Sequence, residues 1–177
     1  MLENIILGII FENDLTGYDI KKYIENNIGI YYKASCGSLY PALKKISSKG
    51  FVTFYEELQG KRKKIFYHIT ESGKDKFLEW LTEPMDILDG TNLNLTKIYF
   101  FHHLPIEKRK ELLLDFESKN EQYLSDLMTI EAKLQTLELN NLSYYTLSTL
   151  YYGISVTKKT LEWCRHIRED KPLKDFK

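Results

Sequence analysis

The stretch Gly37-Ser38-Leu39-Tyr40-Pro41-Ala42-Leu43-Lys44-Lys45-Ile46 decides the fold of this 177-residue chain. Its apolar residues Leu39, Leu43 and Ile46 recur at i, i+4 and i+7, the spacing that puts side chains on one face of a helix. Tyr40, Lys44, Lys45 and Ser48 are left to face solvent. The pattern therefore predicts an amphipathic helix with a polar and basic outer face.

Proline and glycine set the ends that we expect for this helix. Pro41 is tolerated in a first helical turn, where its missing N–H would be unpaired anyway, so the helix should begin near Gly37 or Ser38 with Ser38 as the N-cap. Lys49-Gly50 should end it, because glycine readily adopts the left-handed conformation of a C-terminal cap.

A β-hairpin is predicted directly after this helix. Residues 51–57 and 65–70 are rich in β-branched and aromatic residues, and a turn containing Gly60 separates them. Four consecutive cations occupy the tip: Lys61, Arg62, Lys63 and Lys64. Within residues 33–64 there are eight Lys and Arg residues against two Glu residues, although the whole chain has no net charge. This window is where a polyanion should bind.

Helical patterns flank the deciding stretch. The isoleucines of residues 5–10 predict a short buried helix, and Thr16 should cap a second one that ends near Gly29. After the hairpin, Thr70 or Ser72 should cap a fourth helix that Pro84 stops. The order of three helices, a hairpin and a fourth helix is that of a winged helix-turn-helix.

The rest of the chain predicts a helical hairpin. A short apolar helix is expected at residues 95–101, a long one at 106–139, and a final one after Asn140-Asn141. We therefore expect a mainly α fold with a small β-hairpin: a DNA-binding domain at 1–83, a linker at 84–95 and an antiparallel helical dimerisation domain at 96–177. The apolar stripes of the long helices suit either an intramolecular core or a dimer seam.

A winged helix suggests how the chain would meet DNA. The third helix would enter the major groove, where Ser35, Ser38, Tyr40 and Lys44 could reach base edges and phosphates. The cations of the hairpin tip could neutralise phosphates or reach into a minor groove. The alternative is a winged-helix module that docks onto another protein without binding DNA, for which an exposed apolar patch would be more typical.

Several other classes of protein are not favoured by the sequence. It contains no nucleophile elbow, phosphate-cradling glycine loop or paired metal motif, so we expect no enzyme, no cofactor and no metal site, the adjacent His102 and His103 included. The apolar start lacks a signal-peptide pattern, and no run spans a bilayer, which favours a cytoplasmic protein. Cys36 could sense redox state, but it has no nearby resolving cysteine, and a packing role is the simpler interpretation.

Four motifs, in order, resemble the PadR family of transcriptional regulators. They are Thr16-Gly17-Tyr18-Asp19-Ile20, Gly37-Ser38-Leu39-Tyr40-Pro41-Ala42-Leu43, Gly50-Phe51-Val52 and Tyr67-His68-Ile69-Thr70-Glu71-Ser72-Gly73. The second half, with Lys97-Ile98-Tyr99-Phe100-Phe101, Tyr152-Gly153-Ile154 and Glu162-Trp163, is similar to the C-terminal helical domain of the longer members.

The resemblance implies a homodimeric repressor that reads an inverted repeat in double-stranded DNA, with the dimer formed by the C-terminal domain and the N-terminal helix. It also implies that small aromatic compounds relieve repression in some members. The aromatic residues of the final helix, among them Tyr151, Tyr152 and Trp163, suit either an effector pocket or a dimer core. Carried over by position, Tyr18, Ser38, Tyr40, Pro41 and Lys44 would lie at the DNA face, with the wing tip at residues 60–64. Together with the winged-helix interpretation, the expected DNA-contacting residues are Tyr18, Ser35, Ser38, Tyr40, Pro41, Lys44, Lys45, Lys61, Arg62, Lys63 and Lys64.

Overall fold

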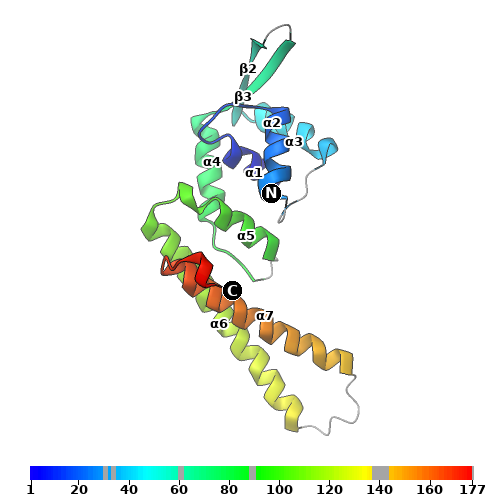
Figure 1. Ribbon diagram of the computed structural model, residues 1–177, viewed down its shortest axis with the longest axis vertical. Helices are drawn as coiled ribbons and strands as arrows, with labels where there is room; N and C mark the ends of the chain where they lie inside the picture. Colours follow the sequence, from blue (N-terminus) through cyan, green and yellow to red (C-terminus); the bar gives the residue numbers. More distant parts are fainter. Residues whose placement is uncertain (30–31, 33–34, 60–61, 88–90, 137–143, 177) are drawn as a thin grey trace. The chain divides into compact units, whose positions relative to one another are not determined.

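Two compact units make up the chain. The computed structural model describes residues 1–29, 32, 35–59, 62–87, 91–136 and 144–176 (Figure 1). The first unit comprises Met1–Glu83 and Asp89–Leu104, and the second comprises Pro84–Leu88 and Pro105–Lys177.

The first unit is a winged helix, as predicted. In chain order it contains α1 (Leu2–Ile9), β1 (Leu15–Thr16), α2 (Gly17–Tyr23), the π-helical turn η1 (Ile24–Ile28), α3 (Cys36–Ser48), β2 (Val52–Gln59), β3 (Arg62–Ile69), α4 (Glu71–Thr82), α5 (Thr91–Tyr99) and the 3-10 turn η2 (Phe101–His103). The strands form an antiparallel sheet in the order β1-β3-β2. The two-residue strand β1 was not predicted, because a strand so short has no periodicity to detect.

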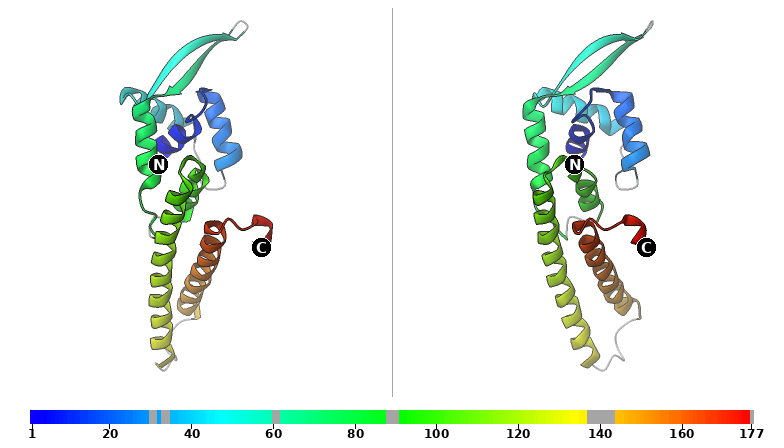
Figure 2. Two further views of the ribbon diagram at one scale, coloured as in Figure 1. Left: turned by 90° about the vertical axis from the view of Figure 1, so that its left-hand side faces the viewer. Right: turned by 60° about the vertical axis from the view of Figure 1, so that its left-hand side comes forward.

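The hairpin β2–β3 projects beyond the helices of the first unit (Figures 1 and 2). Its register runs from Val52 opposite Ile69 to Gln59 opposite Arg62. Among the described side chains of the hairpin, those at its base are buried: Val52 and Ile69 are 2% and 3% exposed. The outer part of the hairpin therefore offers both faces to solvent or to a partner.

A single apolar core holds the helices of the first unit. The side chains of α1 are buried almost all round, as expected of a short helix made mainly of isoleucine and leucine. Leu39, Leu43 and Ile46 of α3 are each at most 1% exposed, which confirms the inward face predicted for that helix.

The turn between α3 and the hairpin is fixed from both sides. Gly50 adopts φ 75°, the left-handed conformation that the sequence predicted for the end of α3. The amide of Phe51 donates to the Ile46 carbonyl at 3.0 Å, and the Gly50 amide donates to the Ser47 carbonyl at 3.0 Å. These two bonds form a Schellman motif, so the direction in which the chain leaves α3 is set.

The start of α4 locks the same turn. Thr70 caps α4 by accepting a hydrogen bond from the Gly73 amide at 3.1 Å, and its hydroxyl donates to the Gly50 carbonyl at 2.7 Å. The Thr70 amide donates to the Phe51 carbonyl at 3.0 Å. Gly73 packs so tightly there that a Cβ atom would lie 2.1 Å from the Phe51 carbonyl oxygen.

The segment containing α5 belongs to the first unit, whereas the sequence analysis divided it between the linker and the C-terminal domain. Phe100 is 1% exposed and meets Phe77 of α4 edge to face, with ring centroids 5.5 Å apart. The buried ammonium group of Lys97 donates to the Glu83 carbonyl at 3.1 Å. Whether residues 84–95 act as a linker between independently folding domains stays a prediction.

The second unit is built on an antiparallel pair of helices, α6 (Ile106–Thr136) and α7 (Tyr144–Arg168), followed by the 3-10 turn η4 (Leu173–Asp175). Buried Glu117 on α6 accepts hydrogen bonds from Arg165 at 2.6 Å and from Arg168 at 3.0 Å on α7. Burial raises the pKa of the Cys164 thiol to about 12. No helix in the described part of the chain is long and apolar enough to cross a membrane.

Two glycine substitutions test the packing at the α4 turn. In Gly73→Ala the new methyl group would collide with the Phe51 carbonyl, so we expect the free energy of unfolding to fall by about 1–3 kcal/mol. Gly153→Ala in α7 is the matched control, because its Cβ would meet Leu127 at an ordinary 3.5 Å. That variant should be neutral or stabilised by up to about 1 kcal/mol. Urea unfolding followed by circular dichroism measures both, and equal stabilities would contradict the close approach.

Candidate nucleic-acid interface

The N-cap of α3 lies three residues earlier than predicted. Ser35, not Ser38, is the N-cap, and Ser38 occupies the third helical position. The two serines bond reciprocally: the Ser35 amide donates to the Ser38 hydroxyl at 3.2 Å, and that hydroxyl donates to the Ser35 carbonyl at 2.9 Å. The prediction was wrong because it took Ser38 for the cap itself, when Ser38 is the second partner of the cap.

Pro41 consequently lies beyond the first turn of α3, contrary to the prediction. Its ring nitrogen has no hydrogen to donate to the carbonyl of Gly37. Both residues are exposed, so water can satisfy that carbonyl and the helix tolerates the proline. The side chain of Cys36 lies outside the described residues.

The outer face of α3 carries the predicted polar residues. Tyr40, Lys44 and Ser48 follow one another at i, i+4 and i+8, and all three are exposed. The ring of Tyr40 packs against the start of α2, where a Cβ at Gly17 would lie 3.0 Å from it. Tyr18, the next residue of α2, is 67% exposed.

The basic residues of α3 differ in their surroundings. Lys45 donates to the Glu3 carboxylate of α1 at 2.5 Å, and Lys49 lies 3.7 Å from the same carboxylate. The hydrogen bond from Lys45 holds the pKa of Glu3 below its ordinary value. Lys44 has no carboxylate within 4 Å among the residues that the structure describes. Among the described cations of this face, Lys44 is therefore the one without a carboxylate partner.

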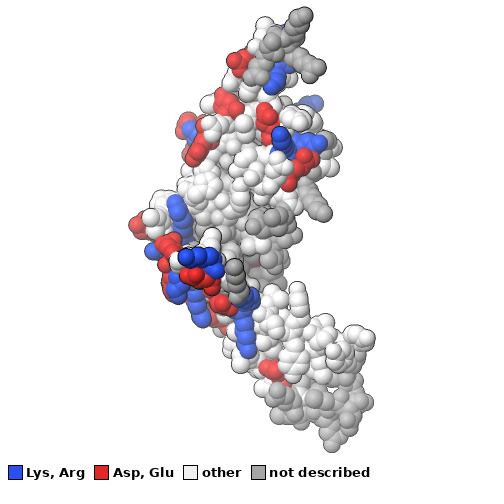
Figure 3. Space-filling view, viewed as in Figure 1, with Lys and Arg blue, Asp and Glu red and all other residues white. Residues whose placement is uncertain are grey.

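The hairpin is less basic than its sequence suggests. Lys63 pairs with Glu56 at 2.9 Å, and Lys64 lies opposite Glu57 in the strand register. Lys61 and the side chain of Arg62 fall outside the described part of the chain, so their predicted role is not placed. On the face seen in Figure 3, acidic and basic side chains alternate over the first unit.

A hollow of about 440 Å³ joins α3 to the hairpin. It is lined by Tyr40, Lys44, Ser47, Ser48, Phe54, Ile65 and Tyr67. Burial, and then the neighbouring Tyr40, raise the pKa of the Tyr67 hydroxyl. Ser47, Phe54 and Ile65 were not predicted as site residues, although the alternating apolar residues of the hairpin indicate that one strand face continues toward α3.

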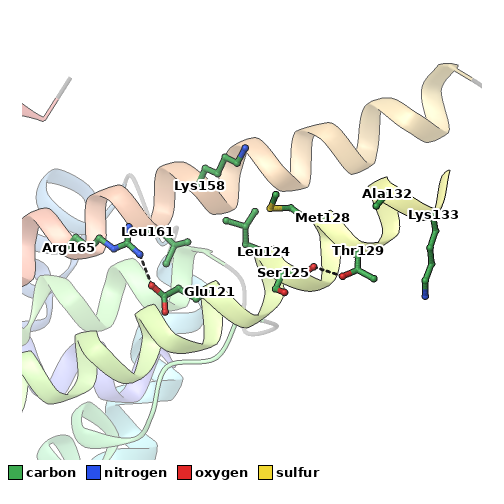
Figure 4. A pocket seen from close by; sticks show the side chains of 10 residues that line it. All are labelled: Glu121, Leu124, Ser125, Met128, Thr129, Ala132, Lys133, Lys158, Leu161 and Arg165. Carbon is green, nitrogen blue, oxygen red and sulfur yellow. Dashed lines mark hydrogen bonds and ion pairs between the residues drawn. The ribbon is translucent and has the colours of Figure 1, made fainter. Parts of the chain in front are cut away.

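The residues proposed for an effector site are not gathered into a hollow. Tyr151 and Tyr152 are 47% and 70% exposed, and Trp163 lies about 16 Å further along α7. A separate hollow of about 840 Å³ lies between α6 and α7, and none of the three lines it (Figure 4). Its apolar lining comes from Leu124, Met128, Ala132 and Leu161.

Comparisons with known proteins cover both units. Residues 6–79 match the transcriptional regulator PadR-like family, and residues 93–170 match the virulence activator alpha C-terminal family. The negative transcriptional regulator PadR of Bacillus subtilis is 34% identical over 136 residues, which are 76% of this chain and 75% of that protein. A probable transcriptional regulator of Mycobacterium tuberculosis is 27% identical over 85 residues, covering 48% of this chain and 45% of that protein.

Solved structures similar to the chain include two of Bacillus subtilis PadR. The complex with operator DNA is 29% identical, with a TM-score of 0.48, and covers 95% of this chain and 97% of that one. The complex with p-coumaric acid is 28% identical, with a TM-score of 0.44, and covers 95% and 96% of the two chains.

The contact between Glu3 and Lys45 predicts a pH effect on stability. Because the pKa of Glu3 is lowered on folding, the contact stabilises the protein above the ordinary glutamate pKa and is lost as the pH falls through the lowered value. Glu3→Gln should therefore lower the free energy of unfolding by about 0.5–1 kcal/mol at pH 7, and the difference should vanish once the pH falls below the lowered pKa of Glu3. The control Glu12→Gln changes an exposed glutamate and should have little effect; a pH-independent deficit in Glu3→Gln would contradict the contact.

Proposed function

The chain belongs to the PadR-like family of transcriptional regulators, and on that premise we propose that it is a homodimeric repressor that binds an inverted repeat in double-stranded DNA. Members of this family are regulators, not enzymes. In the proposal α3 enters the major groove and the hairpin follows the adjoining backbone. A regulator of this kind acts on the chromosome, so we place it in the cytoplasm.

One observation carries the DNA-binding proposal: α3 and the hairpin share a single surface. Tyr40 and Lys44 of α3 line the same hollow as Phe54 and Ile65 of the hairpin. An element that enters a major groove and an element that contacts the neighbouring strand must lie side by side in this way. The exposed ammonium group of Lys44, with no carboxylate near it in the described structure, supplies a charge for a phosphate.

Residue roles follow from position on this surface. Ser35 and Ser38 lie at the start of α3, where the free amides and the positive end of the helix dipole favour a phosphate. Tyr18, Tyr40, Pro41 and Lys44 are exposed toward the same partner, and we propose that they include the base-reading contacts. Lys45 is proposed as a lesser contact, because Glu3 already neutralises it. Lys61, Arg62, Lys63 and Lys64 would bind phosphates without reading sequence.

The second unit is proposed to hold the dimer together. Exposed apolar side chains on α6 and α7 include Met128, Ile130, Tyr144, Tyr145 and Val156. On the face seen in Figure 3, the part of this unit near the turn between the two helices is mostly uncharged. A second copy of the chain would cover such a surface, and two-fold symmetry would then present two copies of α3 to two half-sites.

We also propose that a small aromatic compound relieves repression. The support lies in the aromatic side chains of α7, among them Tyr151, Tyr152 and Trp163, which could stack on a flat ring. Because they do not form a hollow within one chain, such a site would need residues from the partner copy.

A second candidate function is docking onto another protein. Phe54 and Leu58 of the hairpin are 62% and 69% exposed, and apolar side chains in the open are typical of a protein interface. The two functions differ in salt dependence, because neutralising DNA phosphates releases counterions and apolar docking does not.

Adjacent lysines of α3 provide the test. We expect binding to a duplex selected from a randomised library to weaken steeply between 50 and 200 mM salt, with a log–log slope of about 0.9 per phosphate contact. Lys44→Ala should reduce both the affinity and this slope, by about one contact per protomer. Lys45→Ala is the matched control and should have a smaller effect, because Glu3 already holds Lys45. Fluorescence anisotropy titrations measure both; a flat salt response of the parent protein would contradict DNA binding.

A further inference from the structure

One face of the hairpin carries apolar side chains from the core outward. Residues opposite each other in an antiparallel pair share a face, so Val52 and Ile69 lie on the same side as Phe54 and Tyr67. Ile65, opposite Glu56, continues that side toward the tip. The face is buried at its base, but Phe54 is 62% and Ile65 is 44% exposed. The row of apolar side chains thus extends beyond the helices of the first unit that could cover it.

This exposed face is one wall of the hollow between α3 and the hairpin. The hairpin lines one side of the hollow with Phe54, Ile65 and Tyr67, and α3 lines the other side with Tyr40 and Lys44. The hollow also contains a polar group without a partner: the buried hydroxyl of Ser47 has no hydrogen bond among the described residues. A buried hydroxyl left without a hydrogen bond costs free energy. Its place in the wall therefore favours an occupant that can donate a hydrogen bond to it or accept one from it.

The chemistry of the walls selects the occupant. An apolar floor, a free ammonium group at Lys44 and an unpaired hydroxyl at Ser47 together suit a group with a hydrocarbon edge beside an anion. The acidic residue of this strand face in the described hairpin, Glu56, is paired with Lys63, and Lys44 has no carboxylate within 4 Å among the described residues. The backbone of DNA has this character, because each deoxyribose presents C–H groups between two phosphates.

The position of the hollow agrees with its chemistry. A strand of DNA separates the major groove, where α3 would lie, from the minor groove beside which the hairpin would lie. The surface between α3 and the hairpin must then face the sugar-phosphate backbone of that strand. The hollow occupies this place.

We propose that the hollow holds a deoxyribose of the bound strand, packed on Phe54 and Ile65, with the adjoining phosphate at Lys44. The inference rests on the proposed DNA-binding function and adds to the affinity for DNA a contribution that does not depend on salt concentration. It also gives the surface a preference for deoxyribose, because a ribose 2′-hydroxyl would lose its water against apolar side chains.

Hairpin variants of the full-length protein test this component. Phe54→Ala should weaken binding to the selected duplex about tenfold while leaving the salt slope unchanged, because it removes apolar contact area but no charge. Ile65→Ala should also weaken binding without changing the salt slope, and it replaces Phe54→Ala as the test variant if Phe54→Ala folds poorly. Leu58→Ala is the matched control: Leu58 is exposed on the same strand and does not line the hollow, so its loss should change affinity less than about twofold.

Single ribonucleotides placed in turn along the selected duplex identify the sugar. We expect one position in each half-site to weaken binding by the parent protein, and that penalty to disappear in Ile65→Ala. A penalty that persists in Ile65→Ala, or no sensitive position, would overturn the assignment.

The outcomes separate this inference from the function on which it rests. A parent protein that binds DNA with steep salt dependence, but loses no more affinity in Phe54→Ala than in Leu58→Ala, keeps the proposed function and overturns the inference. A parent protein without salt-dependent DNA binding overturns both and favours a protein partner for the apolar hairpin face.

Discussion

The close approach of α4 to the turn between α3 and the hairpin is the constraint on which the interface depends. Gly73 lies where no side chain fits beside the Phe51 carbonyl, and Thr70 ties the same turn to the start of α4 through Gly50. The turn therefore cannot bend freely, and the angle between α3 and the hairpin is set by packing in the core. A protein that must present a helix and a strand pair to one duplex needs such a fixed angle. This explains physically why the sequence pairs Gly50-Phe51-Val52 with Thr70-Glu71-Ser72-Gly73.

The fold changes the electrostatic picture that the sequence suggests. Counted along the chain, residues 33–64 are strongly basic, but Lys45 and Lys49 meet Glu3 from α1, and Lys63 meets Glu56 on the facing strand. Pairs at the surface contribute little to stability, yet they lower the charge offered to a phosphate. The described interface therefore combines a small number of free cations with polar and apolar contacts, and we expect Lys44 to contribute more to the attraction of a phosphate than its neighbours.

Much of the first unit could be predicted, because its elements leave strong local signals. The helical spacing of Leu39, Leu43 and Ile46 and the left-handed Gly50 are both confirmed. Three features escaped prediction for definable reasons. Ser35 and Ser38 both suit an N-cap, and only the hydrogen bonds show that Ser35 is the cap. The strand β1 is too short to leave a periodic pattern. The segment with α5 joins the first unit through the contact of Phe100 with Phe77, which spans more than twenty residues of sequence and which no local pattern reveals. The hollow could not be predicted either, because the sequence does not show which face of the hairpin turns toward α3.

Amide hydrogen exchange of the full chain, with and without the selected duplex, tests most directly whether α3 and the hairpin act as one DNA-binding surface. The account predicts that DNA slows exchange in the first turns of α3 and in β2 and β3 together, while the amides of α6 and α7 exchange as in the free protein. Slowed exchange confined to α6 and α7, with α3 and the hairpin unchanged, would contradict it.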